Sequence, residues 1–480
     1  MTTIPYAPLA RYAARLHAGI GDRHHVASPL GAWLLLALAA PAATGADRAE
    51  LADVLGVDGE TAAATAAALL DRPHPLVASA SAVWHRPGTD TARLAGWRDG
   101  LPRAATTGPL PDQAGLDGWA REQTLGLVDR FPLTVSPRVL LALASALATR
   151  ISWAVPFDLV PGATLGHDPD TTDRPAGGPG TGRTGDDPGT ERPDHDPGAD
   201  RTAGDPRTER PGDDPGTERP DGDPGRPAGD DGAGRPGSAW AGRLTCALRT
   251  PEHGHRVWIA STGAAGEVAV HAAPAVERDG AGLVVLSVVA DPAVPPADVL
   301  AAGYELAGAA VDGEPARRSL FDLPLGTGPL GTLREERVRT SARGGREERH
   351  HAVLPCWSAR DEHDLTAAGL GFPAAARALG GLLGTEVGVE ARQAAVAHYG
   401  RYGFEAAAVT GAFALVSLPP EGVRRTAELR FGHPYAVLAV ATDHRDGTTG
   451  PWHGVPVFSA WVAAPREPVE ADLADPPEPA

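Results

Sequence analysis

Residues 166–238 form a segment that cannot bury a hydrophobic core, and this constrains the rest of the chain. Glycine, proline, aspartate, arginine and threonine dominate it, and alanine is its only aliphatic side chain. It holds 18 acidic residues and 9 arginines, and the ten residues from Gly185 to Asp194 recur unchanged at 212–221. Because ordering this segment would gain no apolar burial, we expect it to stay disordered.

The two flanks of this insertion have the composition of one large folded domain. Hydrophobic residues make up 42% of the 480-residue chain, an ordinary value for globular proteins. The net charge of −18 argues against nonspecific binding of nucleic acid, because a polyanion would be repelled. We therefore divide the chain into a folded part at 1–165 and 239–465, the disordered insertion at 166–238, and a disordered acidic, proline-rich tail at 466–480.

The N-terminal region reads as helical core and not as a targeting or membrane segment. Apolar residues recur at helical spacing, which predicts a first amphipathic helix, at Leu9, Tyr12, Ala13, Leu16 and Ile20. The most apolar run, 30–40, is too short to span a bilayer. Ser28-Pro29 before it provides an N-cap and a first turn, so we expect a buried core helix there.

Cysteine usage indicates a reducing compartment. The two cysteines, Cys246 and Cys356, do not make a disulfide framework. With no recognisable signal peptide, we expect a cytoplasmic protein, although secretion by another route stays open.

The stretch from Gly403 to Thr410 is typical of a loop that can become a strand. After Gly403 and Phe404 it continues with small or short side chains and no proline: Glu405, Ala406, Ala407, Ala408, Val409 and Thr410. Such a segment can stay exposed or enter a β-sheet as an additional strand.

Four separated motifs, in this order along the chain, resemble the signatures of the serpins, the serine-protease-inhibitor superfamily. They are Ser28-Pro29-Leu30 followed by 44–51; Trp119, Thr124 and Gly126; the run 140–148 leading to 152–158; and 431–435 followed by apolar strands at 436–440 and 457–462. The small-residue stretch after Gly403 precedes the last motif, as a serpin hinge does. The chain is thus similar to a bacterial member of this family that carries a low-complexity insertion.

This resemblance implies an α+β fold in which helices pack around three mostly antiparallel sheets and a reactive-centre loop is exposed. It also implies a mechanism: a target protease cuts the loop and is trapped as an acyl-enzyme while the freed hinge inserts as a new strand. The protein would be a consumed inhibitor of serine or cysteine proteases and not an enzyme. We expect a monomer that needs no cofactor or metal and binds neither nucleic acid nor membrane.

The hinge spacing implied by the resemblance places the scissile bond at Ser417-Leu418, and a second alignment places it at Val416-Ser417. Either bond presents a small residue, which favours an elastase-like or subtilisin-like protease over a trypsin-like one. Arg424-Arg425 lies further along and remains a second candidate bait.

The chain departs from the family pattern at the hinge and under the central sheet. Phe404 stands where inhibitory members carry a small residue, and overpacking a tight site costs about 1–3 kcal/mol. Among the residues that the resemblance assigns to the sheet-opening region, Gly31, Ser145 and Gln393 replace the usual Ser, Asn and His, whereas Ser28 and Trp153 match. A non-inhibitory serpin-fold binding protein is therefore the alternative function.

Other motifs have simpler interpretations. The glycines at 326, 328 and 331 match a dinucleotide-loop pattern, but Pro329 interrupts it, and we expect a turn. The pairs His24-His25 and His350-His351 lack metal-ligand spacing, and we expect solvated loops. Glu362-His363-Asp364 is not expected to form a catalytic group, because neighbours in sequence seldom converge on one substrate atom.

Overall fold

The computed structural model describes residues 6–89, 91–166, 240–313, 316–388, 390–403 and 420–474, which belong to one compact unit. The insertion expected at 166–238 therefore lies outside the described residues except for Gly166. Helices and mostly antiparallel sheets combine in an α+β fold, as the sequence predicts. The α-helices are α1 (Tyr6–Ile20), α2 (Pro29–Ala39), α3 (Gly45–Leu55), α4 (Gly59–Leu70), α5 (Ala92–Asp99), α6 (Gln113–Gln123), α7 (Pro296–Asp312), α8 (Phe372–Leu383) and α9 (Glu470–Leu473).

A six-stranded sheet, called here the core sheet, forms the centre of the domain. Its strand order is β1 (His25–Ala27), β17 (Pro456–Val462), β16 (Tyr435–Asp443), β9 (Ala281–Val289), β8 (Gly266–Pro274) and β7 (Arg256–Thr262). Both β9 and β16 are buried along their whole length, which explains their continuous apolar sequences. Helix α7 covers one face of this sheet, and the main hydrophobic core lies on the other.

A second six-stranded sheet, called here the charged sheet, carries acidic and arginine side chains. Its order is β10 (Gly326–Gly328), β11 (Gly331–Arg339), β15 (Glu421–Arg430), β12 (Arg346–Leu354), β6 (Cys246–Arg249) and β5 (Asp158–Pro161). The predicted glycine-rich turn is confirmed, because Gly328 pairs with Gly331 in the β10–β11 hairpin.

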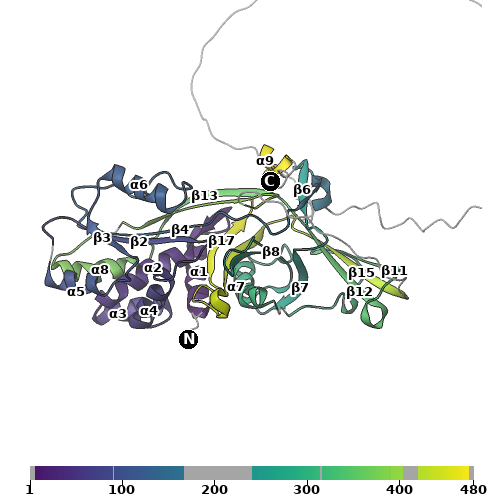
Figure 1. Ribbon diagram of the computed structural model, residues 1–480, viewed down its shortest axis with the longest axis horizontal. Coiled ribbons are helices and arrows are strands. Elements are labelled where there is room, and N and C mark those ends of the chain that lie inside the picture. The colour runs from purple at the N-terminus through teal and green to yellow at the C-terminus, as the bar shows by residue number, and fades with distance from the viewer. Residues whose placement is uncertain are drawn as a thin grey trace, which may run out of the picture. The chain divides into compact units, whose positions relative to one another are not determined.

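The third layer is parted into two groups of strands. One group is β3 (Thr106–Pro109), β2 (Ala78–His85) and β4 (Leu141–Ala148); the other is the ribbon of β13 (Trp357–Asp364) and β14 (Arg392–Tyr399). In Figure 1 both groups lie in one layer, with α6 on one side and α2 on the other.

The predicted N-terminal helices are confirmed. Leu9, Tyr12 and Leu16 of α1 are buried, and nearly every residue of α2 is buried. The Ser28 side chain caps α2 by accepting a hydrogen bond from the backbone N–H of Gly31 at 3.2 Å. None of the helices in the described ranges is long and apolar enough to cross a membrane.

The expectation of solvated loops is wrong for three of the four histidines in the two pairs, whereas His24 lies in a bend before β1. His25 is fully buried on β1, and His350 and His351 are half-buried on β12. His25 Nδ1 lies 2.8 Å from the carbonyl oxygen of Arg23, whereas His350 Nε2 and His351 Nδ1 are buried without a hydrogen-bond partner among the described residues. No group of residues in the described ranges has the arrangement of a metal site.

Candidate functional site

The candidate site is the gap between β4 and β14, where two strand edges face each other. Within the described residues, β4 pairs only with β2, and β14 only with β13. The edges that face the gap therefore carry backbone groups with no strand partner there, which makes them able to accept an added strand.

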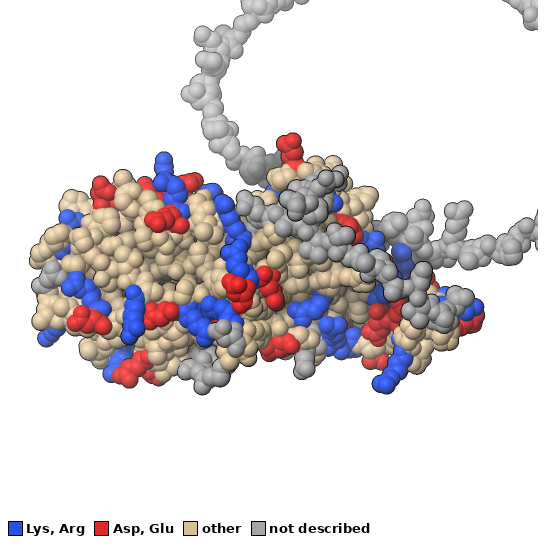
Figure 2. All heavy atoms as spheres, in the orientation of Figure 1, with Lys and Arg blue, Asp and Glu red and all other residues tan. Residues whose placement is uncertain are grey.

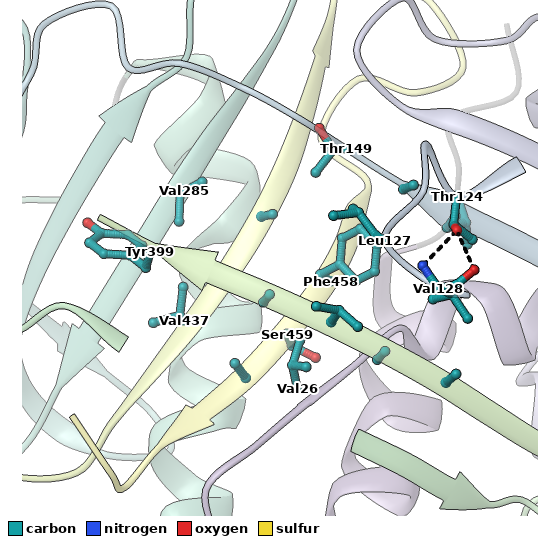
Figure 3. A pocket seen from close by; sticks show the side chains of 18 of the residues that line it. Val26, Thr124, Leu127, Val128, Thr149, Val285, Tyr399, Val437, Phe458 and Ser459 are labelled. Atoms are coloured by element: carbon teal, nitrogen blue, oxygen red, sulfur yellow. Dashed lines mark hydrogen bonds between the residues drawn. The ribbon is translucent and has the colours of Figure 1, made fainter. Parts of the chain in front are cut away.

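Two cavities follow this gap. The larger, of about 680 Å³, is lined by α2, α6, β4, α8 and the start of β14. The smaller, of about 50 Å³, lies near the end of β14 and is lined by Tyr399, Trp357 and Phe458 among others. Figure 3 shows β14 crossing β17 at this smaller cavity, with Leu127 and Phe458 among the side chains that line it.

The loop after α6 covers the same cavity, and its motif residues explain its shape. Thr124 Oγ1 donates to the carbonyl oxygen of Ala120 at 2.7 Å and accepts from the N–H of Val128 at 3.0 Å, a contact drawn in Figure 3. Leu125 and Gly126 both adopt positive φ, at 55° and 76°. The Thr-x-Gly spacing thus provides a hydrogen-bonded turn that aims Leu127 into the gap.

Four of the five predicted sheet-opening residues form one hydrogen-bond network under the gap. The Gln393 amide on β14 accepts from the N–H of Ser28 at 2.9 Å and donates to the carbonyl oxygen of Ser28 at 2.8 Å. Ser145 on β4 donates to the carbonyl oxygen of Gly31 at 2.9 Å. Both edges of the gap are therefore tied to the start of α2, and the network joins neither edge directly to the other.

Gly31 and Ser28 make this arrangement possible. A Cβ atom at Gly31 would lie 3.1 Å from Leu147 and 3.4 Å from Ser145 Oγ, so a larger residue would crowd β4. Ser28 Oγ also donates to the carbonyl oxygen of Val457 at 2.8 Å, which connects the network to the core sheet.

Trp153, the fifth predicted residue, lies instead at the mouth of the gap. It is fully buried. Its indole N–H donates to the carbonyl oxygen of Gly400 at 3.0 Å, and its backbone N–H donates to the carbonyl oxygen of Tyr402 at 3.1 Å. Its ring belongs to an aromatic cluster with Phe157 and Tyr399, at centroid distances of 6.1 and 5.2 Å. Trp357 stacks on Tyr399 at 5.9 Å.

Gly403 joins both sides of this mouth. It forms antiparallel bridges with Gly400, at the end of β14, and with Ser152, on the segment that continues β4. Its φ is +104°, and a Cβ atom there would lie 2.5 Å from the carbonyl oxygen of Ile151. Only glycine fits this position without displacing backbone.

The C-terminal segment holds the turn that precedes Gly403. Buried Asp472 accepts from the N–H of Arg401 at 2.9 Å, and Tyr402 donates its hydroxyl to the carbonyl oxygen of Ala474. Residues 466–474, which the sequence assigned to a disordered tail, thus have defined contacts. The polar composition of the segment did not predict these contacts, because they involve backbone and charged groups and not apolar burial.

The other predicted residues fall into three groups. The hinge residues 404–410 and the scissile candidates Val416, Ser417 and Leu418 lie outside the described residues. Arg424 and Arg425 lie within β15, each paired with glutamates of neighbouring strands, which removes them as an exposed bait. His363 faces inward from β13, where its Nε2 lies 2.7 Å from the carbonyl oxygen of Val26, so it forms no catalytic group with its neighbours.

Sequence reasoning missed Tyr399, Phe157 and Asp472. Phe157 lies within the motif 152–158, and Tyr399 lies a few residues before Gly403, so the local motifs were a usable signal. Asp472 had no such signal, because its partner is a backbone N–H 71 residues away.

The architecture defines a class of proteins in which helices surround three sheets, one of them parted. Among solved structures, this is the serpin fold. A thyroxine-binding globulin in complex with thyroxine matches over 96% of this chain and 99% of its own, at 12% identity and a TM-score of 0.50. An Arabidopsis serpin in its native stressed conformation covers 96% and 98%, at 12% identity and a TM-score of 0.51.

A third match is cleaved Serpin 42Da, which covers 97% of each chain at 12% identity and a TM-score of 0.51. At this identity the likeness establishes the fold alone. No protein-family model and no curated protein sequence matches the chain.

Proposed function

We propose that this protein is a suicide inhibitor of serine proteases that acts by loop cleavage and strand insertion into the β4–β14 gap. The observation that carries the proposal is Gly403, which bridges both sides of the gap at its mouth. Strand addition to an open sheet edge is the known mode of serpin loop insertion. Because each molecule would be consumed, the protein would not act as an enzyme and would need no cofactor.

The direction of the chain at Gly403 supports insertion. Both bridges of Gly403 are antiparallel. A strand that continued from this point would run antiparallel to β14 and to β4 together, so it could pair with both edges.

The two bridges also set a register for such a strand. Extended without a bulge, they would place Ala408 between Ala395 and Leu147, and Thr410 between Gln393 and Ser145. Ser145 and Gln393 belong to the network under the gap. The inserted Thr410 hydroxyl would therefore meet polar partners, and the alanine would meet apolar ones.

Phe404 is the position at which insertion would be hardest. The same register would place it beside Tyr399 and Ile151, next to the aromatic cluster. The adjacent cavity of about 50 Å³ is small for a phenyl ring, so side chains would have to move. We expect insertion to occur but to be slowed by this residue.

The partner would be a protease that accepts small or apolar residues, because both scissile candidates, Val416-Ser417 and Ser417-Leu418, present a small residue. The direct test is incubation with elastase-like, subtilisin-like and trypsin-like proteases, followed by a denaturing gel. The proposal predicts a covalent complex with one of the first two, and a released fragment beginning at Ser417 or Leu418. Complete cleavage by every protease without a complex would contradict it.

A non-inhibitory binding protein with this fold is the second candidate, and Phe404 is the observation that favours it. If the ring blocks insertion, Phe404→Thr should convert a pure substrate into an inhibitor that forms the covalent complex. If neither form makes a complex, the binding function takes precedence.

A further inference from the structure

The strand β15 begins two residues after the loop that would be cut, and it lies between two long partners. It pairs in parallel with β12, from Arg346↔Val423 to Val353↔Arg430. On its other side it pairs antiparallel with β11 over its whole length, from Arg339↔Glu421 to Gly331↔Leu429. The β10–β11 hairpin therefore covers the edge that β15 would otherwise expose.

Arginine side chains reinforce this pairing on both faces of β15. Arg424 bonds Glu347 of β12 at 3.0 Å and Glu336 of β11 at 3.2 Å. Arg425 bonds Glu335 of β11 at 2.8 Å. Both arginine side chains are largely buried, at 20% and 15% exposure, and Glu347 is 19% exposed, whereas Glu335 and Glu336 are partly open to solvent.

Arg425 is also held by the segment before β10. Its guanidinium donates to the carbonyl oxygens of Leu320 and Leu323 at 2.7 and 3.0 Å, and it lies 4.8 Å from the centre of the Phe321 ring. Figure 2 shows acidic and basic side chains gathered at the end of the charged sheet where β11, β12 and β15 lie in Figure 1.

The two ends of the loop lie at opposite ends of β15. The carbonyl oxygen of Arg401 accepts a hydrogen bond from the N–H of Phe157, just before β5. Across the charged sheet from there, Asp158 pairs with Arg249, Arg249 with Val353, and Val353 with Arg430. Gly403 is thus near the level of Arg430, whereas the loop ends beside Glu421. At about 3.3 Å per residue, Glu421 lies about 30 Å further along the sheet.

An uncut loop is too short to fill the gap while β15 stays in place. Of the sixteen loop residues 404–419, eight, spanning about 26 Å, would be used to pair along the eight-residue β14. The remaining eight residues could span at most about 28 Å. They would have to run back along the whole of β14, about 26 Å, and then cover the further distance of about 30 Å to Glu421. Insertion without cleavage therefore requires β15 to leave the charged sheet, whereas cleavage removes the tether.

We propose that the β10–β11 hairpin is a clamp on β15 that prevents the uncut loop from entering the gap. This inference rests on the proposed inhibitory function and adds how that function is preserved before a protease arrives. The clamp contacts β15 through the carboxylates of Glu335 and Glu336 and, at the other end of β11, through the hydroxyl of Thr332, which accepts from Arg430 at 2.7 Å.

The test compares the wild type with the double variant E335Q/E336Q. Both proteins are incubated at elevated temperature, shown by mass spectrometry to be uncut, and assayed for protease complex formation and thermal midpoint. The clamp predicts that the variant converts to a more stable, inactive form about tenfold faster or more than the wild type. Glu60→Gln, which removes an exposed ion pair of α4 with Arg48, should leave the rate unchanged.

A second variant keeps the test decisive if E335Q/E336Q folds poorly. Arg337 pairs directly with Val423, so R337C/V423C can link β11 to β15 by a disulfide. The oxidised form should convert more slowly than its own reduced form; equal rates would overturn the clamp.

Each protein is also cut in the loop as a reference. If the cut proteins are stabilised but E335Q/E336Q converts no faster than the wild type, the clamp is wrong and the inhibitory function stands. If cutting stabilises none of them, the proposed function itself fails.

Discussion

Single residues at the mouth of the gap are constrained by backbone geometry. Gly403 has φ +104° and lies against the carbonyl oxygen of Ile151, so the requirement for glycine is steric. Trp153 and Asp472 then fix the turn before it through hydrogen bonds to backbone groups of residues 400–402. The conformation of the turn at residues 400–403 is therefore fixed mainly by contacts to main-chain atoms.

Replacing Gly403 by alanine should destabilise the protein by about 1–3 kcal/mol, because the left-handed backbone and the short contact are both unfavourable. Chemical denaturation measures this change. Gly19→Ala in α1 is the matched control: a Cβ there has open space, so stability should stay equal or rise by up to about 1 kcal/mol. Equal behaviour of the two variants would show that the Gly403 bridges do not form.

Three buried histidines connect α1, β1 and β13. His17 Nδ1 lies 2.7 Å from His25 Nε2, and His17 Nε2 lies 2.7 Å from Ser459 Oγ. Burial, and then the neighbouring histidines His25 and His363, lower the pKa of His17 to about 3. Burial lowers the pKa of His25 to about 4 and also lowers that of His363.

This cluster should make stability fall in mild acid. The unfolded chain protonates His17 and His25 near pH 6.5, whereas the folded protein holds the pKa of His17 at about 3 and that of His25 at about 4. Stability is therefore complete above about pH 6.5 and is lost as the pH falls, by about 1.4 kcal/mol per unit for each histidine. Unfolding followed between pH 7 and 4 measures the slope. His17→Gln should make it shallower.

Among the elements, the most unexpected is the C-terminal segment. Asp472, in the short helix α9, accepts from the N–H groups of Arg401 and Val469 at 2.9 and 3.0 Å. Arg466 lies 3.5 Å from the same carboxylate and 2.8 Å from the ring of His398 on β14. The segment thus connects β14 to the turn at the mouth of the gap.

Asp472→Ala should destabilise the protein by about 1–3 kcal/mol, because it leaves the N–H groups of Arg401 and Val469 without that acceptor. Glu470→Ala on the same helix removes an exposed carboxylate and should change stability by less than about 0.5 kcal/mol. Denaturation of both variants measures the difference. A neutral Asp472→Ala would show that the segment does not hold the turn.

The ends of the insertion lie together at the edge of the charged sheet. The N–H of Gly162 donates to the carbonyl oxygen of Thr245 at 2.9 Å, and Leu165 packs with Ala241 and Leu244. A short linker could therefore replace the insertion without strain.

Deletion of residues 167–239 with a Gly-Ser linker in their place should leave the thermal midpoint within about 4 °C of the wild type, a change of at most about 3 kcal/mol. Calorimetry measures it. A large loss of stability or a failure to fold would mean that the insertion packs against the domain.

For the whole molecule, the motif resemblance predicts the serpin fold. Local patterns of apolar residues and a helix cap predict the buried helix α2 and the strands β16 and β17. The resemblance also brings Ser28, Gly31, Ser145 and Gln393 together. The sequence could not predict the histidine cluster, the Asp472 contact or the β11–β15 pairing. These depend on polar groups distant in sequence, for which no local periodicity exists.

The proposed inhibition depends on the gap between β4 and β14 accepting the loop as a strand. The most direct test is the thermal midpoint of the protein before and after a single cut within residues 404–419. Eight new backbone pairings at about 0.5–1.5 kcal/mol each, about 4–12 kcal/mol in all, predict a rise of about 5–15 °C. The cut Ala408→Arg variant should lack this rise, because a charge would be buried in the gap without a partner. Equal midpoints for intact and cut wild-type protein would contradict the account.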